Sequence, residues 1–280
     1  MFEVERFAFI GPGVMAEAMV NGLLMRAGVG PRSLTAGGPR PERLDELAKH
    51  YGISTTTDLR AAVADATVIV LSVKPQSLPA VLEELQGGIP AGALVLSIVA
   101  GAQLGSLTEK LGHPAVVRAM PNTPAQIGQG ITVWTVTAAV SPAQREIARQ
   151  VLECLGKQIF VEDEDELDMA TALSGTGPAY VFLFMEALVD AGVHLGFPRR
   201  IAEQLVVQTL KGSVAFYESS PSHLARLRNE VTSPAGTTAA ALYYLEKAGF
   251  RPAISRAVWA AYERSVQLGR GQKRAPVGQE

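Results

Sequence analysis

Residues 231–246 combine features that could hold a small anionic substrate. Residues 234–236, Pro-Ala-Gly, are typical of a loop, and a helical apolar pattern begins directly after Thr237 and Thr238. The first backbone N–H groups of a helix have no partner within the helix, and the helix dipole is positive there. The segment therefore predicts a site at which amides and hydroxyls hold a carboxylate or phosphate. A helix that is simply capped by a threonine is the alternative.

A second candidate site follows the first predicted strand, residues 7–10. The sequence Gly-Pro-Gly-Val-Met-Ala at 11–16 leads into an expected helix at 16–27, which is the context of a dinucleotide-binding turn. Gly11 permits the tight turn, and Gly13 lets a cofactor pyrophosphate approach the backbone. A plain strand-to-helix turn is the alternative. The candidate cofactor residues of this turn are Ile10, Gly11, Pro12, Gly13, Val14 and Met15.

The end of the second predicted strand, residues 33–36, bears on the choice of cofactor. No Asp or Glu follows it to bond the ribose 2′-OH of NAD, and Gly-Gly-Pro-Arg stands at 37–40 instead. Arg40 could form charge-assisted hydrogen bonds with a 2′-phosphate. The sequence therefore favours NADP, with NAD as the alternative. A solvated arginine that binds nothing is the other interpretation.

Further strand ends and one rigid loop complete the candidate cofactor crevice. In open α/β sheets, ligands bind beyond the carboxyl ends of the strands. The loop at 120–124, Met-Pro-Asn-Thr-Pro, is too rich in proline for a helix or central strand. The alternative for this loop is a simple turn between two elements. The alternative for Lys74, at the end of the strand at 68–73, is a solvated lysine. The candidate residues are Ser72, Val73, Lys74, Pro75, Val99, Ala100 and Asn122.

These motifs together resemble those of the pyrroline-5-carboxylate reductases. The matching segments are V-T-S-P-A-G-T-T at 231–238, G-P-G-V-M at 11–15, V-K-P-Q at 73–76, R-A-M-P-N-T-P at 118–124 and S-G-T-G-P-A-Y at 174–180. The resemblance implies that a nicotinamide cofactor reduces the cyclic imine of L-1-pyrroline-5-carboxylate to L-proline, the last step of proline biosynthesis. It implies catalytic roles for Thr238 and Ser233. The substrate-binding residues that we assign are Gly236, Thr237, Thr238 and Glu164.

Three positions depart from the pattern of that family. Ala235 stands where a glycine is usual, Leu59 where an asparagine near the cofactor adenosine is usual, and Asn229 near an expected aspartate. These departures bear on cofactor affinity and loop rigidity more than on the reaction. Two other functions stay open: a β-hydroxyacid dehydrogenase, which would use a lysine such as Lys211 in the second half, and a non-catalytic nucleotide-binding regulator.

Composition limits the partners and the cellular location. The 280 residues are 48% hydrophobic and 19% charged, with a formal net charge of -2, so nucleic acid and membranes are not expected partners. The four histidines show no ligand spacing, so we expect no metal. The single cysteine, Cys154, lies in an apolar pattern and indicates a reducing compartment. Without a signal peptide pattern at the N-terminus, a cytoplasmic protein is expected.

The chain is expected to form two domains with different architectures. Alternating strand and helix patterns predict an α/β domain of the Rossmann type at 1–161, with helices wound around a parallel sheet. Helical periodicity predicts an all-α domain at 162–268, followed by a polar tail at 269–280. The resemblance implies that this all-α domain is the substrate and dimerisation domain. Residues 181–185 and 201–207 supply more apolar surface than short helices can hide. We therefore expect a homodimer or a ring of dimers. The remaining strand candidates are 68–73, 94–99, 116–117, 131–136 and 159–161, and the helix breaks are expected at 175–178, 196–198, 219–221 and 233–234.

Overall fold

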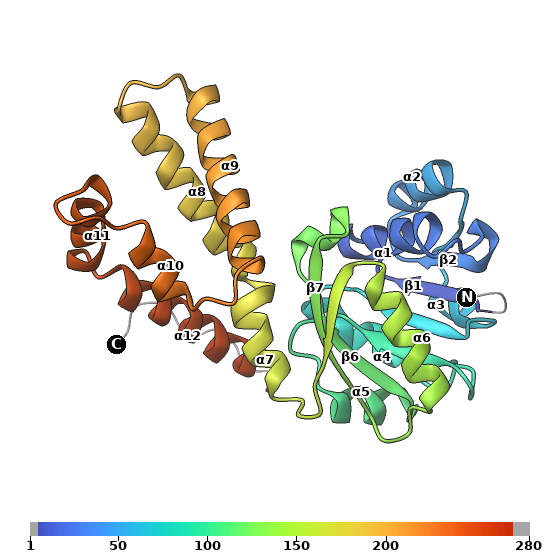
Figure 1. Ribbon diagram of the computed structural model, residues 1–280. Coiled ribbons are helices and arrows are strands. Elements are labelled where there is room, and N and C mark those ends of the chain that lie inside the picture. The colour runs from blue at the N-terminus through green and yellow to red at the C-terminus, as the bar shows by residue number, and fades with distance from the viewer. Residues whose placement is uncertain (1–4, 271–280) are drawn as a thin grey trace. The chain divides into compact units, whose positions relative to one another are not determined.

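The computed structural model describes residues 5–270 of the chain. They divide into two compact units, and each is considered by itself. The first unit comprises residues 5–176 together with 260–270, and the second comprises residues 177–259. Figure 1 shows the sheet of the first unit and the helices of the second.

The first unit is built on one eight-stranded sheet of order β3-β2-β1-β4-β5-β6-β7-β8. The strands are β1 Phe7–Ile10, β2 Leu34–Gly37, β3 Ser54–Thr56, β4 Val68–Leu71, β5 Leu94–Ser97, β6 Val116–Met120, β7 Gly130–Val136 and β8 Gly156–Phe160. The expected strands are confirmed, and β3, a short polar strand at the edge, is an addition. Its residues Ser54–Thr56 lack the apolar run on which the prediction of strands depended.

One strand pair breaks the parallel arrangement that the sequence pattern indicated. β6 and β7 pair antiparallel, whereas the other neighbouring strands pair parallel. Only a short 3₁₀ helix, Thr123–Ile127, lies between them. A parallel crossover needs about a dozen residues or more, usually with a helix, so a connection this short returns the chain beside β6 in the opposite direction.

Helices cover both faces of the sheet, which explains why its central strands are apolar throughout. Successive residues of a strand point to opposite faces, and β1 shows this directly. Phe7 and Phe9 pack in one core with α1 and α2, while Ala8 and Ile10 pack in the other with α3 to α5. The helices are α1 Val14–Met25, α2 Pro41–Tyr51, α3 Leu59–Val63, α4 Leu78–Leu85, α5 Leu104–Leu111 and α6 Pro142–Glu153.

After β8 the described chain is helical, as expected. The elements are α7 Glu166–Ala170, a π-helical turn Thr171–Gly175, α8 Gly177–His194, α9 Arg199–Glu218, α10 Leu224–Glu230, α11 Thr237–Lys247 and α12 Phe250–Gly269. The four expected breaks are present, the one at 175–178 only as a bend at Thr176 within the otherwise helical stretch Glu166–His194. A fifth break, before α12, occurs at Gly249, whose φ of 75° is unfavourable for other residues.

The second unit has a small core between two long helices. Val189 of α8 packs against Ala202 and Val206 of α9, and a Cβ on Gly192 would lie 2.9 Å from the Cβ of Ala202. The close approach explains the glycine in α8. Much of the remaining apolar surface is exposed, including Phe182 (59%) and Leu183 (67%).

The first unit is discontinuous in sequence because the chain leaves it at Thr176 and returns to it at Ala260. The predicted domain boundary at 161/162 lies elsewhere, because it marks the change from strands to helices. That boundary stays a prediction. Helix α12 begins in the second unit and ends in the first. Of the predicted tail at 269–280, residues 271–280 lie outside the described residues.

Candidate functional site

The glycine-rich turn after β1 is held tightly against the end of β4. Gly11 has a φ of 88°, and a Cβ on it would lie 2.4 Å from Cγ1 of Val73. The amide of Gly11 donates to the carbonyl oxygen of Gly37, 2.9 Å away. The hydroxyl of Ser72 lies 3.0 Å from the carbonyl oxygen of Gly11. The strand ends at 10–13 and 72–75, which the sequence singled out separately, therefore meet.

Helix α1 begins directly after this turn with free amide donors. Gly13 precedes the helix, and no side chain caps it. The guanidinium of Arg43 fixes the turn from outside, because its Nε donates to the carbonyl oxygen of Pro12 at 3.1 Å and it also pairs with Glu17. Burial raises the pKa of Glu17, but hydrogen bonds from Arg43 and Tyr51 outweigh burial and leave this pKa below its ordinary value. The turn thus presents a rigid helix N-terminus suited to a pyrophosphate.

The second candidate contact of a cofactor lies at the end of β2. Arg40 is exposed and directly precedes α2, whose N-terminus no side chain caps. A Cβ on Gly38 would lie 2.6 Å from Cδ of Pro12, so the segment at 37–40 packs against the glycine-rich turn. This arrangement places a cation and a free helix N-terminus beside the same turn, a combination that suits a phosphate. Lys74 is exposed and directly precedes the short 3₁₀ helix Pro75–Ser77.

The loop after β6 joins two motifs that lie far apart in sequence. The side-chain amide of Asn122 donates to the carbonyl oxygen of Ser174 at 3.2 Å, and its oxygen accepts from the amide of Ile131 at 3.0 Å. A Cβ on Gly175 would lie 2.8 Å from Cε of Met120. Both polar atoms of Asn122 therefore already have protein partners, and the side chain fixes the π-helical turn to β6.

A buried ionic cluster lies next to this loop, and sequence reasoning did not find it. Arg118 of β6 is 3% exposed and donates to Oε1 of Glu164 at 2.9 Å and to Oδ1 of Asp168 at 3.1 Å. The hydroxyl of Ser265 donates to the same oxygen of Asp168 at 2.6 Å. The signal in the sequence was a lone arginine within the apolar strand at 116–120.

Glu164 was predicted to bind substrate, and the structure gives its carboxylate two protein partners. Besides Arg118, its Oε1 accepts from the amide of Leu104 at 2.8 Å, the first residue of α5. Its side chain stays 28% exposed. A role toward substrate remains a proposal, and the observed role is to cap α5.

The predicted substrate loop lies in the second unit. Ala235 has a φ of 57°, a left-handed conformation that explains why a glycine is usual there. Gly236, and not a threonine, precedes α11, and no side chain caps this helix. The alternative of an ordinary threonine cap is therefore wrong. Thr237 and Thr238 occupy the first two positions of α11, where both the hydroxyls and the free amides can face an anion.

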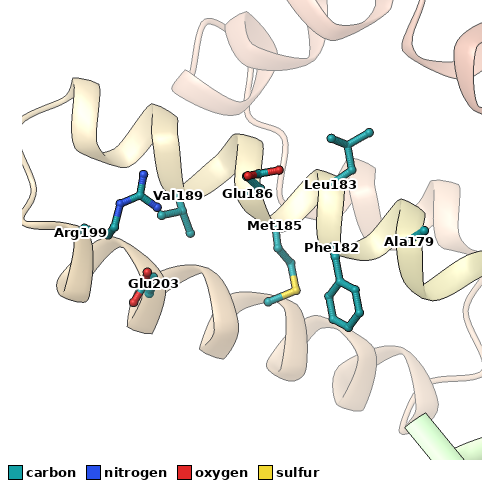
Figure 2. Close-up of a pocket in the computed structure, with 8 residues that line it drawn as sticks. All are labelled: Ala179, Phe182, Leu183, Met185, Glu186, Val189, Arg199 and Glu203. Carbon is teal, nitrogen blue, oxygen red and sulfur yellow. The ribbon is translucent and has the colours of Figure 1, made fainter. Parts of the chain in front are cut away.

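The surface between α8 and α9 carries a shallow hollow of about 540 Å³. Figure 2 shows Phe182 and Met185 extending from α8 toward α9, with Arg199 and Glu203 on α9 at the other end. The hollow contains none of the predicted site residues. It belongs to the exposed apolar face of the second unit.

Two other classes of site were tested against the described residues. Within residues 5–270, no group of three or more His, Cys, Asp or Glu side chains could hold a metal ion. Among the described residues, one helical stretch, Glu166–His194, is long and apolar enough to cross a membrane by length and composition; it contains an 18-residue segment with a mean hydropathy of 1.3, of which 11% is buried.

Comparisons with known proteins identify the relatives of the chain. A model for pyrroline-5-carboxylate reductase dimerisation matches residues 164–268, and a model for NADP oxidoreductase, coenzyme F420-dependent, matches residues 6–101. The pyrroline-5-carboxylate reductase of Synechocystis is 41% identical, over 95% of this chain and 98% of its own. That of Pseudomonas aeruginosa is 42% identical, over 94% and 96%.

Solved structures agree in fold over nearly the whole chain. The pyrroline carboxylate reductase of Plasmodium falciparum with NADP bound has a TM-score of 0.89 at 32% identity, covering 96% of this chain and 100% of that one. The Coxiella burnetii enzyme has a TM-score of 0.85 at 35% identity, covering 97% and 100%. The Rossmann-type domain and the helical dimerisation domain expected from sequence are thus confirmed. With this identity over nearly its full length, the chain belongs to the pyrroline-5-carboxylate reductase family.

Proposed function

We propose that the chain reduces L-1-pyrroline-5-carboxylate to L-proline with NADPH. The observation that carries the proposal is the uncapped N-terminus of α11, where the backbone amides and the hydroxyls of Thr237 and Thr238 are available to a ligand. Relatives about 40% identical to this chain carry the name pyrroline-5-carboxylate reductase, which also supports the proposal.

The loop at 233–238 supplies what this substrate needs. The amides of Thr237 and Thr238 bind the carboxylate of the substrate, because they lie at the positive end of the helix dipole. The amide of Gly236, which was also expected to bind it, already donates to the carbonyl oxygen of Ser233 at 3.1 Å. The hydroxyl of Thr238 accepts a hydrogen bond from the protonated ring nitrogen and afterwards donates to the amine nitrogen that forms. Ser233 supports the loop and the proton transfer.

Imine reduction needs no strongly shifted general base. The cofactor, when bound, supplies the hydride to the imine carbon, and the electron pair of the C=N bond moves to nitrogen. The task of the protein is to align the two reactants and exclude water. The absence of His, Asp and Glu between residues 231 and 241 agrees with this chemistry.

The glycine-rich turn and the strand ends around it hold the cofactor. The amides after Gly13 bind the pyrophosphate, and Arg40 with the N-terminus of α2 binds the 2′-phosphate, so NADPH is preferred over NADH. The relative from Plasmodium falciparum was solved with NADP bound. Lys74 and the backbone at 72–75 and 99–100 complete the crevice.

The second unit forms a homodimer, or a larger ring built from dimers. Support comes from the dimerisation model that matches residues 164–268 and from exposed apolar residues on α8 and α9, such as Phe182 and Leu205 (50%). The same match supports a role of the apolar stretch Glu166–His194 in a protein interface rather than in a membrane. The reduced, buried thiol of Cys154 suits the cytoplasm.

Light scattering at micromolar concentration should give a dimer mass or a multiple of it, and a monodisperse monomer would refute this assembly.

Turnover tests the function directly. The purified protein is given pyrroline-5-carboxylate with NADPH or NADH, and the loss of nicotinamide absorbance is followed together with the formation of proline. A parallel set with β-hydroxy acids and NADP tests the dehydrogenase alternative that Lys211, an exposed residue of α9, kept open. Inactivity toward the imine with both cofactors would refute the proposal.

A further inference from the structure

We propose that Arg118 is a positioning residue for this reaction. Its guanidinium fixes, at the crevice end of the sheet, the beginning of α7 and, through Asp168, the end of α12. The proposal rests on the proposed function, because its main readout is the turnover of pyrroline-5-carboxylate. It assigns to the buried cluster at 118, 164, 168 and 265 a role in placing the loops that follow β5 and β6, where the cofactor crevice is expected.

The guanidinium lies at the junction of three structural elements. It projects from β6, two residues before the loop at 120–124, and binds one carboxylate before α7 and one within α7. Asp168 is 4% exposed, and Ser265, which bonds it from α12, is 2% exposed. A buried cation shared by two carboxylates permits only a narrow range of positions for all three segments.

The contacts form a closed circuit around the end of β5. From Asp168 the circuit passes to Ser265 and along α12 to its last turn, which rests on Gly101. A Cβ on Gly101 would lie 2.9 Å from both the Cβ of Leu268 and the amide nitrogen of Gly269. Glu164 closes the circuit, because it joins Arg118 to the amide of Leu104, three residues after Gly101.

The proposed pyrophosphate and 2′-phosphate contacts lie elsewhere in the same unit, at the turn after β1 and at the end of β2. A displacement of the loops that follow β5 and β6 would therefore disturb the alignment of the two reactants more than the affinity for the cofactor.

Stability alone does not explain such a cluster. Replacing a buried ion pair by apolar residues of similar volume is often neutral or stabilising, so a buried arginine with two carboxylates is weak evidence for a purely stabilising role. Buried polar groups are better known for fixing one arrangement of the segments that they join. Here the specified arrangement involves the loops that follow β5 and β6, where the cofactor crevice is expected.

The test compares two variants with a matched control. Arg118→Lys keeps the charge but loses the forked geometry, and Ser265→Ala removes only the bond between α12 and Asp168. Arg149 is the control, because it also bridges two carboxylates, Glu146 and Glu153, but lies exposed on α6. Each protein is assayed for kcat and KM with pyrroline-5-carboxylate, NADPH affinity by fluorescence, and Tm.

A positioning role predicts a specific pattern among these measurements. In Arg118→Lys, kcat/KM for the imine should fall at least tenfold, and in Ser265→Ala about threefold or more, while NADPH affinity changes less than threefold. Arg149→Lys should leave all three values unchanged. If the two variants lower only Tm and keep the kinetic constants of the control, the proposal is wrong.

Two safeguards separate the possible failures. If Arg118→Lys does not fold, Ser265→Ala decides, since it deletes one hydroxyl. If the unaltered protein does not turn over the imine, the proposed function fails, and amide hydrogen exchange then tests the circuit. Ser265→Ala should speed exchange in α7 and in the last turn of α12 but not in α6. Unchanged exchange in α7 and α12 would refute the circuit itself.

Discussion

Val73 occupies the space that any side chain on Gly11 would need. The 2.4 Å between Cγ1 of Val73 and an ideal Cβ on Gly11 is far inside van der Waals contact, and the Val73 backbone lies 2.9 Å from the same point. Since the backbone is involved, a rotamer change cannot relieve the overlap. The turn after β1 and the end of β4 are thus fitted to one another, and this fit forms the floor of the proposed pyrophosphate site.

Gly11→Ala should therefore abolish NADPH binding or prevent folding. Gly87→Ala is the matched control, because Gly87 also has a positive φ, 69°, but no atom lies within 4 Å of an added Cβ. The control should lose only about 1 kcal/mol of stability from the unfavourable φ. NADPH affinity by fluorescence and Tm check both variants. Equal behaviour of the two would contradict the importance of the contact with Val73.

Thr238→Ala should lower kcat/KM for pyrroline-5-carboxylate by about ten- to a hundredfold. This corresponds to the loss of a hydrogen bond of about 1–3 kcal/mol to the reacting nitrogen. Tm should hardly change, because Thr238 does not cap α11. Thr238→Ser keeps the hydroxyl and should retain most of the activity. A Thr238→Ala enzyme as active as the unaltered protein would remove Thr238 from the mechanism.

Arg40→Ala should weaken the preference for NADPH over NADH by about tenfold or more, because a charge-assisted bond to the 2′-phosphate is lost. Arg32→Ala is the control: Arg32 is exposed before β2, whereas Arg40 follows β2 at the end where ligands bind. The ratio of kcat/KM for the two cofactors is the measurement. An unchanged ratio in Arg40→Ala would assign the 2′-phosphate to another residue.

Ala235→Gly should raise Tm slightly. A left-handed alanine costs roughly 1–2 kcal/mol, and part of this is offset by the greater freedom of glycine in the unfolded chain. Ala248→Gly, at an ordinary right-handed position after α11, should lower Tm instead. Thermal unfolding of both variants checks the prediction, which fails if the two shift Tm in the same direction.

Cys154 should react slowly with thiol reagents in the folded protein. Burial raises the pKa of its thiol to about 11, against a smaller lowering by Arg26, so at pH 8 only about one molecule in a thousand is a thiolate. The rate of modification should rise about tenfold per pH unit between pH 7 and 9. Denaturant should abolish the protection. A rate that levels off below pH 9 in folded protein would contradict the raised pKa.

The strands and the cofactor turn could be predicted because their signals are local. The run at 7–10 followed by Gly11 and Gly13 contains the strand, the turn and the helix start within a few residues. The polar edge strand β3 and the reversed direction of β7 were missed or misassigned. Neither is encoded in apolar periodicity, since an edge strand needs no apolar run and direction depends on the length of a connection.

The ionic cluster could not be predicted because its members are distant in sequence. Arg118 and Asp168 are 50 residues apart, and Asp168 and Ser265 are 97 apart. Glu164 was singled out only as a substrate contact, and no local signal indicated that its carboxylate accepts from the amide of Leu104 at the start of α5. At Thr238 the local signal was correct about the helix, but α11 begins at Thr237, two residues before the start of the apolar pattern at Ala239.

The return of α12 to the first unit has a consequence for how the chain can be divided and when it can fold. A fragment that ends at residue 161 would keep Arg118 buried in β6 without Glu164 or Asp168, and an unpaired buried charge costs several kcal/mol. During synthesis, the nucleotide-binding unit cannot reach its final packing until Ser265 and Leu268 have left the ribosome. Its completion therefore waits for the helical unit that is translated before them.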